Sequence, residues 1–183
     1  YGDHRDLLSF PTRRSSDLQW RDFAVRELVR EMDRQVLTDG VHFESSVSYH
    51  RLVTECFLSS AALCRRHGVE LTPGFHRRLE KMCDVVAGYT KPNGLAPQIG
   101  DGDNGRLHVL TGYSRRDVRD HRHVLGLGAW YFDRGDWRAA AGSSWIEGLW
   151  FGVDARTGPT PAATSRGTIA FPAGGFYILR HER

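Results

Sequence analysis

The stretch QVLTDGVHFESSVSYHRLVTE, residues 35–55, places an Asp-Gly pair between two segments with helical periodicity. Gly40 permits the backbone conformations that tight turns require, so the pair predicts a turn between two helices. Directly after this turn, titratable side chains gather at the start of the second helix: His42, Glu44, Tyr49 and His50. The stretch therefore predicts a helical hairpin with a candidate functional site at its loop end.

Three helices are predicted around this turn, because apolar residues recur at three- and four-residue steps. Before the turn, one buried face is formed by Trp20, Phe23, Val25, Leu28, Val29, Met32 and Val36. After it, a second helix over residues 46–66 carries the stripe Tyr49, Leu52, Val53, Cys56, Phe57, Ser60, Leu63 and Cys64. A third helix begins with Thr72 as N-cap and Pro73 at the first helical position.

The rest of the chain alternates loops with weaker helical patterns. Residues 91–104, KPNGLAPQIGDGDN, are rich in Gly, Pro, Asn and Asp and predict a loop, and loops of this length are usually functional. Helical character returns over residues 116–132 and more weakly over residues 136–152. After a connector rich in Pro, Thr and Ala, residues 153–168, the sequence IAFPAGGFYILR, residues 169–180, has strand formers about a Gly-Gly turn.

These elements predict a mainly α protein of helical hairpins, followed by entry into a β domain. Hairpins joined by short polar turns suit an α/α toroid, and four or five helices are too few to close one, so we expect a partial toroid. The predicted division is a partial toroid over residues 19–152, a linker over residues 153–168 and the start of the β domain over residues 169–183.

The opening segment, YGDHRDLLSFPTRRSSDL, is polar and has no periodicity. It resembles the translation of a short-read sequencing adapter. We therefore predict that residues 1–18 are disordered and foreign to the fold, and that the chain is part of a longer protein whose own N-terminus lies elsewhere.

Charge and cysteine content restrict the function only weakly. A net charge of +3 is compatible with an acidic polymer as ligand but does not require one. The three cysteines lack CxxC spacing and lie among apolar residues, which favours buried free thiols over a metal site or disulfides. No apolar run is long enough for a membrane span, and we expect neither membrane insertion nor a nucleic-acid partner.

Three segments resemble the heparinase II/III family of polysaccharide lyases. The family signature is matched by Asp39, Gly40, Phe43, Glu44, Ser46, Tyr49 and His50. The loop PQIGDGDNGRL, residues 97–107, and FPAGGFYILR, residues 171–180, also resemble the family, the latter where its β-sandwich domain begins. The order of the three segments matches the family and covers nearly all of residues 19–180.

The resemblance implies β-elimination on a polysaccharide that contains uronic acid. Such an enzyme removes the proton at C5 and expels the oxygen at C4, so it needs a group that neutralises the substrate carboxylate, a base and an acid. Tyr49 matches the family tyrosine that supplies the acid and sometimes the base. The family's carboxylate-neutralising Asn or His and a second catalytic His match no part of this chain, so we expect the chain alone to be inactive. The family also implies an acidic polysaccharide partner, no cofactor, and a periplasmic or secreted location.

A tyrosine titrates near 10, so Tyr49 can act as a base at neutral pH only beside positive charge or hydrogen-bond donors. His42, His50 and Arg51 are close enough in sequence to supply them. The predicted substrate-binding residues are His42, Glu44, His50, Gln98, Asp101, Asp103 and Arg106.

Structural interpretations compete with each of these roles. Tyr49 lies on an apolar stripe and can be a core aromatic, His50 a satisfied histidine, and Glu44 a carboxylate favoured by the helix dipole. His42 can be a surface residue only, and His121 and His123 fit a solvated helix start. The sequence DGDNG contains part of a calcium-loop pattern but lacks the remaining ligands, so no metal is predicted.

Two other functions remain open at this point. Asp101 and Asp103 are a carboxylate pair, and α/α toroids also host glycoside hydrolases. The third possibility is a polysaccharide-binding or assembly protein that keeps the toroid without the chemistry. Elimination yields an unsaturated uronate and hydrolysis does not, so the product distinguishes a lyase from a glycoside hydrolase.

Overall fold

The structure is a computed structural model, and it describes residues 15–110, 117–142, 148, 151–152 and 167–180. Within these residues, helices come first and a pair of strands follows. The elements in chain order are α1 (Ser15–Gln35), α2 (Val47–Arg66), α3 (Pro73–Tyr89), α4 (Arg122–Phe132), α5 (Gly135–Ala141), β1 (Gly167–Phe171) and β2 (Phe176–Arg180).

The boundaries of α2 and α3 follow from side chains that cap their first turns. Ser46 accepts a hydrogen bond from the Tyr49 amide at 3.4 Å, and Thr72 accepts one from the Phe75 amide at 3.2 Å. Each cap satisfies an amide that has no partner inside its own helix. The predicted helix over residues 46–66 and the predicted start at Thr72 and Pro73 are confirmed.

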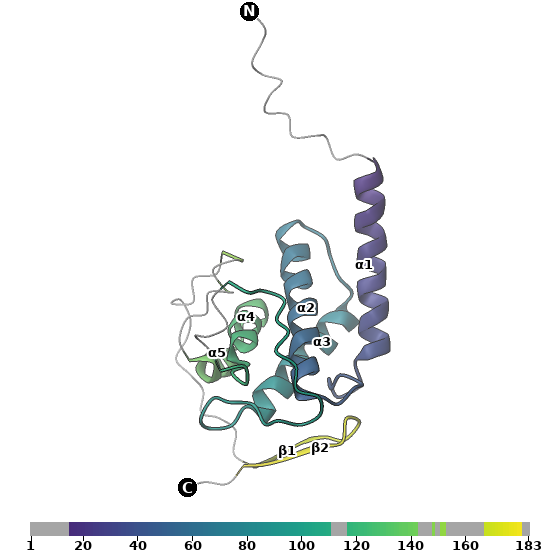
Figure 1. Cartoon of the computed structure of the whole chain (residues 1–183). Helices are drawn as coiled ribbons and strands as arrows, with labels where there is room; N and C mark the ends of the chain where they lie inside the picture. The colour runs from purple at the N-terminus through teal and green to yellow at the C-terminus, as the bar shows by residue number, and fades with distance from the viewer. Residues whose placement is uncertain (1–14, 111–116, 143–147, 149–150, 153–166, 181–183) are drawn as a thin grey trace, which may run out of the picture.

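The core lies where α3 contacts α1, α2 and α4 (Figure 1). Its fully buried side chains come from all four helices and include Met32, Leu58, Phe75, Leu79, Met82 and Leu125. Trp137 on α5 closes one side of this core at 1% exposure. Cys83 is buried within it, whereas Cys56 and Cys64 are half-buried, and all three are free thiols.

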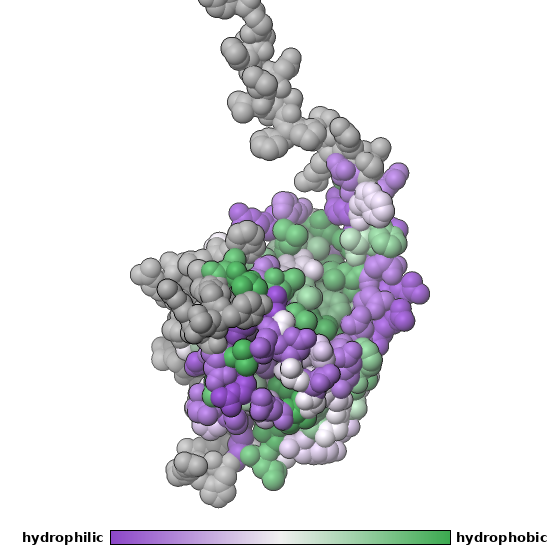
Figure 2. Space-filling view, in the orientation of Figure 1, coloured by the Kyte–Doolittle hydropathy of each residue, from purple (hydrophilic) through white to green (hydrophobic). Residues whose placement is uncertain are grey.

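Only the C-terminal half of α1 packs on the other helices. Figure 1 shows the N-terminal end of α1 extending beyond α2 and α3, and Trp20 and Phe23 are 70% and 49% exposed. The prediction that both residues lie on a buried face is therefore wrong for this chain. In the same orientation, Figure 2 shows apolar surface over α2 beside α1.

Helix α1 also begins earlier than predicted. Its first residue is Ser15, so the last four residues of the segment predicted to be disordered are helical. Asp17 lies in the first turn, where the helix dipole favours a carboxylate. Residues 1–14 lie outside the described part of the chain.

The predicted β segment forms an antiparallel hairpin at one end of the helices (Figure 1). Its register pairs Gly167 with Arg180 and Phe171 with Phe176. The Arg180 guanidinium donates to the carbonyl oxygens of Ala87 and Gly88 at 2.8 and 3.1 Å, near the end of α3. A cation at this end complements the helix dipole, so Arg180 ties the hairpin to the helical part.

The later helices are shorter than predicted. Helix α4 begins at Arg122 rather than at residue 116, because the Asp117 carboxylate accepts the Arg119 amide at 2.9 Å and forms a local turn instead. Helix α5 ends at Ala141, followed by Gly142 with a φ of 75°. Most of the remaining predicted helix, with Trp145 and Trp150, and most of the predicted linker lie outside the described residues.

Candidate functional site

The Asp-Gly turn between α1 and α2 rests directly on α3. Gly40 has a φ of +94°, and a Cβ there would lie 2.5 Å from the Lys81 carbonyl carbon, so a side chain has neither the conformation nor the space. The Lys81 ammonium donates to the Thr38 carbonyl at 2.6 Å. These contacts fix where the chain enters α2 and therefore where Tyr49 stands.

Asp39 connects the same turn to the β hairpin. One carboxylate oxygen accepts the Val41 amide at 3.2 Å, and the other accepts the Gly174 amide at 2.9 Å. The hairpin turn packs closely on Val41, which is 1% exposed. The signature Asp39-Gly40 is thus a structural device that joins three parts of the fold.

His50 stabilises this turn from inside. Its Nδ1 accepts the His42 amide at 3.2 Å, so its Nε2 carries the proton and donates to the Met82 carbonyl at 3.0 Å. The ring is 2% exposed, and burial lowers its pKa to about 4. The predicted substrate contact of His50 is wrong, because both ring nitrogens already bind backbone groups in the interior.

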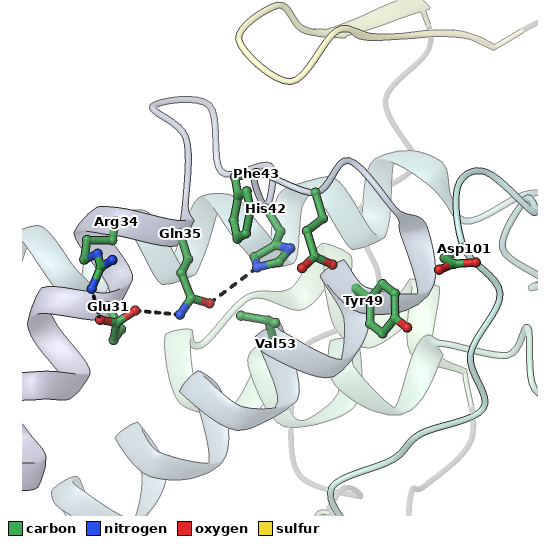
Figure 3. A pocket seen from close by; sticks show the side chains of 9 residues that line it. Glu31, Arg34, Gln35, His42, Phe43, Tyr49, Val53 and Asp101 are labelled. Atoms are coloured by element: carbon green, nitrogen blue, oxygen red, sulfur yellow. Dashed lines mark hydrogen bonds and ion pairs between the residues drawn. The ribbon is translucent and has the colours of Figure 1, made fainter.

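An open cavity of about 850 Å³ lies beside the start of α2. Figure 3 shows its side chains in a row from Arg34 on α1, through His42, to Tyr49 and Asp101. The residues that line it are Glu31, Arg34, Gln35, His42, Phe43, Glu44, Tyr49, Val53 and Asp101. Four predicted site residues, His42, Glu44, Tyr49 and Asp101, therefore share one cavity.

Tyr49 is only partly buried, so the interpretation as a core aromatic does not hold. The negative charge of Asp103 raises its pKa above the usual 10, with smaller contributions from burial, Asp101 and Glu44. The tyrosine is therefore held in its protonated form. This arrangement suits a general acid, not a phenolate base.

The cations predicted to surround Tyr49 are placed elsewhere. Arg51 is 1% exposed and forms an ion pair with Glu55 at 3.1 Å inside the fold. Burial keeps the His50 and His42 rings neutral by lowering both pKa values. Successive helical residues point about 100° apart, so His50 and Arg51 face away from the side that carries Tyr49.

His42 is the cavity residue with unused hydrogen-bonding capacity. It is 2% exposed, and its Nε2 lies 3.4 Å from the Gln35 side-chain oxygen. Its Nδ1 is buried and has no hydrogen-bond partner among the described residues. A buried polar atom of this kind costs stability, so it lowers the stability of this turn.

The loop after α3 is fixed against the first turn of α2. The Ser46 hydroxyl donates to the Asp101 carbonyl at 2.8 Å, and the Val47 amide donates to the Ile99 carbonyl at 3.0 Å. Gly100 lies against Ser46 so closely that a Cβ would come within 2.8 Å of the Ser46 Cα. The loop predicted from its Gly and Asp content is confirmed.

The remaining predicted residues lie on or after this loop. Gln98 and Asp103 line a smaller cavity of about 70 Å³ beneath it, which also includes Asp101. Asp103 accepts the Gly105 amide at 2.7 Å, which fixes its carboxylate. Arg106 lines neither cavity, and its guanidinium lies 3.4 Å from the Asp117 carbonyl oxygen.

Sequence reasoning missed the contribution of α1 to the cavity. Glu31 pairs with Arg34 at 3.0 Å and accepts a hydrogen bond from Gln35 at 2.7 Å. Glu31 lies three residues before Arg34 and four before Gln35, a spacing that places all three on one side of the helix, and this spacing could have indicated the contribution.

The histidines near α4 were also misplaced by the sequence. His121 and His123 are each 3% exposed, so the solvated helix start predicted there is wrong.

Within the described residues, no cluster of three or more His, Cys, Asp or Glu side chains is arranged to hold a metal ion. No helix in that part of the chain combines the length and apolar character needed to cross a bilayer.

Comparison with known proteins places the chain in a family. The family described as Heparinase II/III N-terminus matches residues 8–119, a range that begins within the adapter-like segment. This match covers more than half of the chain, so the chain belongs to the heparinase II/III family. The resemblance predicted from the signature residues is confirmed.

Two relatives from Pedobacter heparinus are similar to the chain. A curated heparin-sulfate lyase is 28% identical over 96 residues, which cover 51% of this chain and 14% of the relative. The crystal structure of a heparan sulfate lyase HepC mutant matches with a TM-score of 0.61 and 22% identity, over 91% of this chain and 23% of that one. The fold class, a mainly helical partial toroid followed by strands, is thereby confirmed. The chain spans less than a quarter of either relative.

Proposed function

We propose that this chain supplies the tyrosine-bearing part of a polysaccharide lyase that cleaves a uronic-acid-containing polysaccharide by β-elimination. Family membership and the names of the two relatives support the class of reaction. The observation that carries the proposal is Tyr49, a protonated phenol that lines an open cavity together with Glu44 and Asp101. A core aromatic would have no such opening.

In the proposed reaction, Tyr49 is the general acid. A base removes the C5 proton, the electron pair forms the C4–C5 double bond, and the C4–O bond breaks. The Tyr49 hydroxyl gives its proton to the departing oxygen, so no alkoxide has to leave. The negative charge of Asp103 favours the protonated phenol until that step.

The same cavity offers hydrogen-bond partners for a sugar ring. We propose that the carboxylates of Glu44 and Asp101 accept sugar hydroxyls, and that His42 contacts the sugar where its ring lines the cavity. We propose that Gln98 and Asp103 bind substrate from the loop. Arg106 is proposed to bind it from the chain that follows the loop.

The cavity offers little unpaired positive charge for the substrate carboxylate. Its arginine, Arg34, is already paired with Glu31 at 3.0 Å, and its histidine is neutral. We propose that the carboxylate-neutralising group and the base come from outside residues 1–183, as the family resemblance implies, and that this chain is inactive by itself. A periplasmic or secreted location is proposed on the same resemblance, and cell fractionation tests it.

The decisive experiment uses the uninterrupted gene product on a panel of heparan-like, alginate-like and bacterial exopolysaccharide chains. A lyase yields products with the far-ultraviolet absorbance of an unsaturated uronate. New reducing ends without that absorbance would favour a glycoside hydrolase, for which Asp101 and Asp103 are the candidate carboxylates. Binding without either product would favour the non-catalytic protein. The 183-residue chain is assayed in parallel, and turnover by it would contradict the proposed inactivity.

A further inference from the structure

The Ser46 side chain binds two parts of the fold at the start of α2. Its oxygen accepts the Tyr49 amide at 3.4 Å, which caps the helix, and the hydroxyl donates to the Asp101 carbonyl at 2.8 Å. A hydroxyl can do both at once, because it has one hydrogen and two acceptor lone pairs. Ser46 is 3% exposed. One buried side chain therefore contacts both the first turn of α2, which carries Tyr49, and the loop that carries Asp101.

The next residue adds a backbone contact to the same loop. The Val47 amide lies in the first turn of α2, where an amide has no acceptor within its own helix, and it donates to the Ile99 carbonyl at 3.0 Å. Val47 is 2% exposed, whereas residues 98–104 are exposed. The loop thus lies on the outside of this turn, and protection of the Val47 amide from exchange reports its attachment.

Gly100 allows the loop to approach α2 closely. Its φ is +74°, and an added Cβ would lie 2.8 Å from the Ser46 Cα and 2.9 Å from the Ser46 Cβ. Neither atom can move without the backbone of α2, so an alanine at this position would push the loop away from the helix.

The two residues that Ser46 contacts line the same open cavity. Tyr49 and Asp101 come from segments far apart in the sequence and lie at one end of the row of side chains in Figure 3. The group of Asp101 that Ser46 holds is its backbone carbonyl, from which the side chain extends. The position of the Asp101 carboxylate at the cavity therefore depends on the bond to Ser46.

We propose that Ser46 is a positioning residue: its hydroxyl holds Asp101 at the cavity that Tyr49 lines, so that the carboxylate meets a sugar hydroxyl while the phenol meets the departing oxygen. This inference rests on the proposed lyase function and deepens it. Ser46 is not among the residues that line the cavity, so it acts through Asp101 and not on the substrate.

Two variants separate the loop from α2 by different means. Ser46→Ala removes the hydroxyl, and Gly100→Ala adds a Cβ against Ser46 while leaving the side chain that caps α2. Each has a matched control away from the cavity. Thr72→Ala removes the equivalent cap of α3, and Gly68→Ala introduces an alanine at a φ of +65° with nothing within 4 Å of it.

The first measurement is amide hydrogen exchange at Val47 in the 183-residue chain, relative to amides in the middle of α2. We expect this relative exchange to become at least about tenfold faster in Ser46→Ala and Gly100→Ala, and to stay unchanged in the two controls. Unchanged exchange in Ser46→Ala would overturn the inference. The same acceleration in Thr72→Ala would also overturn it, since the effect would then report a general loss of stability. If one loop variant does not fold, the other decides.

The second measurement is steady-state elimination by the uninterrupted gene product, on the polysaccharide that the wild type cleaves best. KM should rise at least about fivefold in both loop variants, because a hydrogen bond from the sugar to a carboxylate is weakened. The Tyr49 hydroxyl stays on α2, so kcat should remain within about threefold of the wild type. An unchanged KM in the folded Ser46→Ala variant would contradict the positioning role.

A double-mutant cycle shows whether Ser46 acts through Asp101. Asp101→Asn keeps the carbonyl that Ser46 binds but removes the charge of the side chain, so it should raise KM by itself. In that background, Ser46→Ala should raise KM by less than about twofold more. Effects that simply multiply would show that Ser46 acts by another route, and would overturn the inference.

The failure of this inference and the failure of the lyase function give different results. Exchange at Val47 needs no substrate, so it tests the anchor even if the wild type does not eliminate. In that case the dissociation constant of the polysaccharide takes the place of KM in the same comparison. Elimination by the wild type together with an unchanged KM in both loop variants would contradict the role of Ser46 alone.

Discussion

At the scale of the residue, the buried neutral state of His50 makes folding dependent on pH. Burial lowers its pKa from 6.5 to about 4, so the unfolded chain binds a proton more readily than the folded one. The stabilisation is complete above about pH 6.5 and is lost as the pH falls toward about 4. At about 1.4 kcal/mol per pKa unit, the expected loss is about 3 kcal/mol, measurable as the free energy of unfolding by urea across this range.

The variant His50→Gln provides the control for this prediction. An amide side chain can make similar hydrogen bonds but does not titrate, so the pH dependence should become shallower. Some dependence should remain, because burial also lowers the pKa of His121, to about 3. An identical pH profile in wild type and His50→Gln would show that His50 is not the titrating group.

The residues around Tyr49 show what the sequence could and could not predict. His42, Glu44 and Tyr49 were correctly grouped, because they lie within one turn and one helical start. The prediction that His50 and Arg51 supply positive charge to the phenol was wrong, because a neighbour in sequence can face another side of a helix. Asp103, whose charge raises the pKa of the phenol, is 54 positions away, and no local pattern predicts that influence.

At the scale of the element, boundaries were predictable where a side chain decides them. Ser46 and Thr72 cap α2 and α3, and both starts could be read from the sequence. The start of α4 could not, because Asp117 forms its own turn with Arg119 in a segment whose composition also suits a helix.

Substitution of two glycines with positive φ distinguishes the cost of backbone strain from the cost of a steric clash. Gly40 (φ +94°) has the Lys81 backbone against it, whereas Gly68 (φ +65°) has nothing within 4 Å of an added Cβ. We expect Gly68→Ala to cost about 1 kcal/mol of unfolding free energy and Gly40→Ala clearly more, about 2 kcal/mol or above. Urea unfolding of both variants checks this, and equal losses would mean that the turn does not depend on its contact with α3.

At the scale of the whole molecule, apolar surface is left uncovered at two ends. Trp20 on α1 is 70% exposed, and on β2 Tyr177 and Leu179 are 66% and 80% exposed. Periodicity correctly indicated that α1 has an apolar face, but it does not say what covers that face. The fold class was predictable because hairpins, loop and strand pair follow one another in a recognisable order.

The burial of these side chains predicts that alanine substitutions along α1 lower the free energy of unfolding by very unequal amounts. Met32 is 0% exposed in the core, so Met32→Ala should lower the free energy of unfolding by about 2–5 kcal/mol through the cavity it leaves. Trp20→Ala removes a larger side chain but should change it by less than about 0.5 kcal/mol. Thermal or urea unfolding of the 183-residue chain checks both, and a large loss for Trp20→Ala would show that α1 packs more completely than described.

The role of Tyr49 is tested most directly by Tyr49→Phe in the uninterrupted gene product, with elimination followed by the far-ultraviolet absorbance of the unsaturated uronate. Only the hydroxyl is removed, so polysaccharide binding and the unfolding midpoint should stay close to those of the wild type. If Tyr49 is the acid, kcat falls by at least about a hundredfold. A kcat within about tenfold of the wild type, in a folded variant that still binds the polysaccharide, would contradict that role.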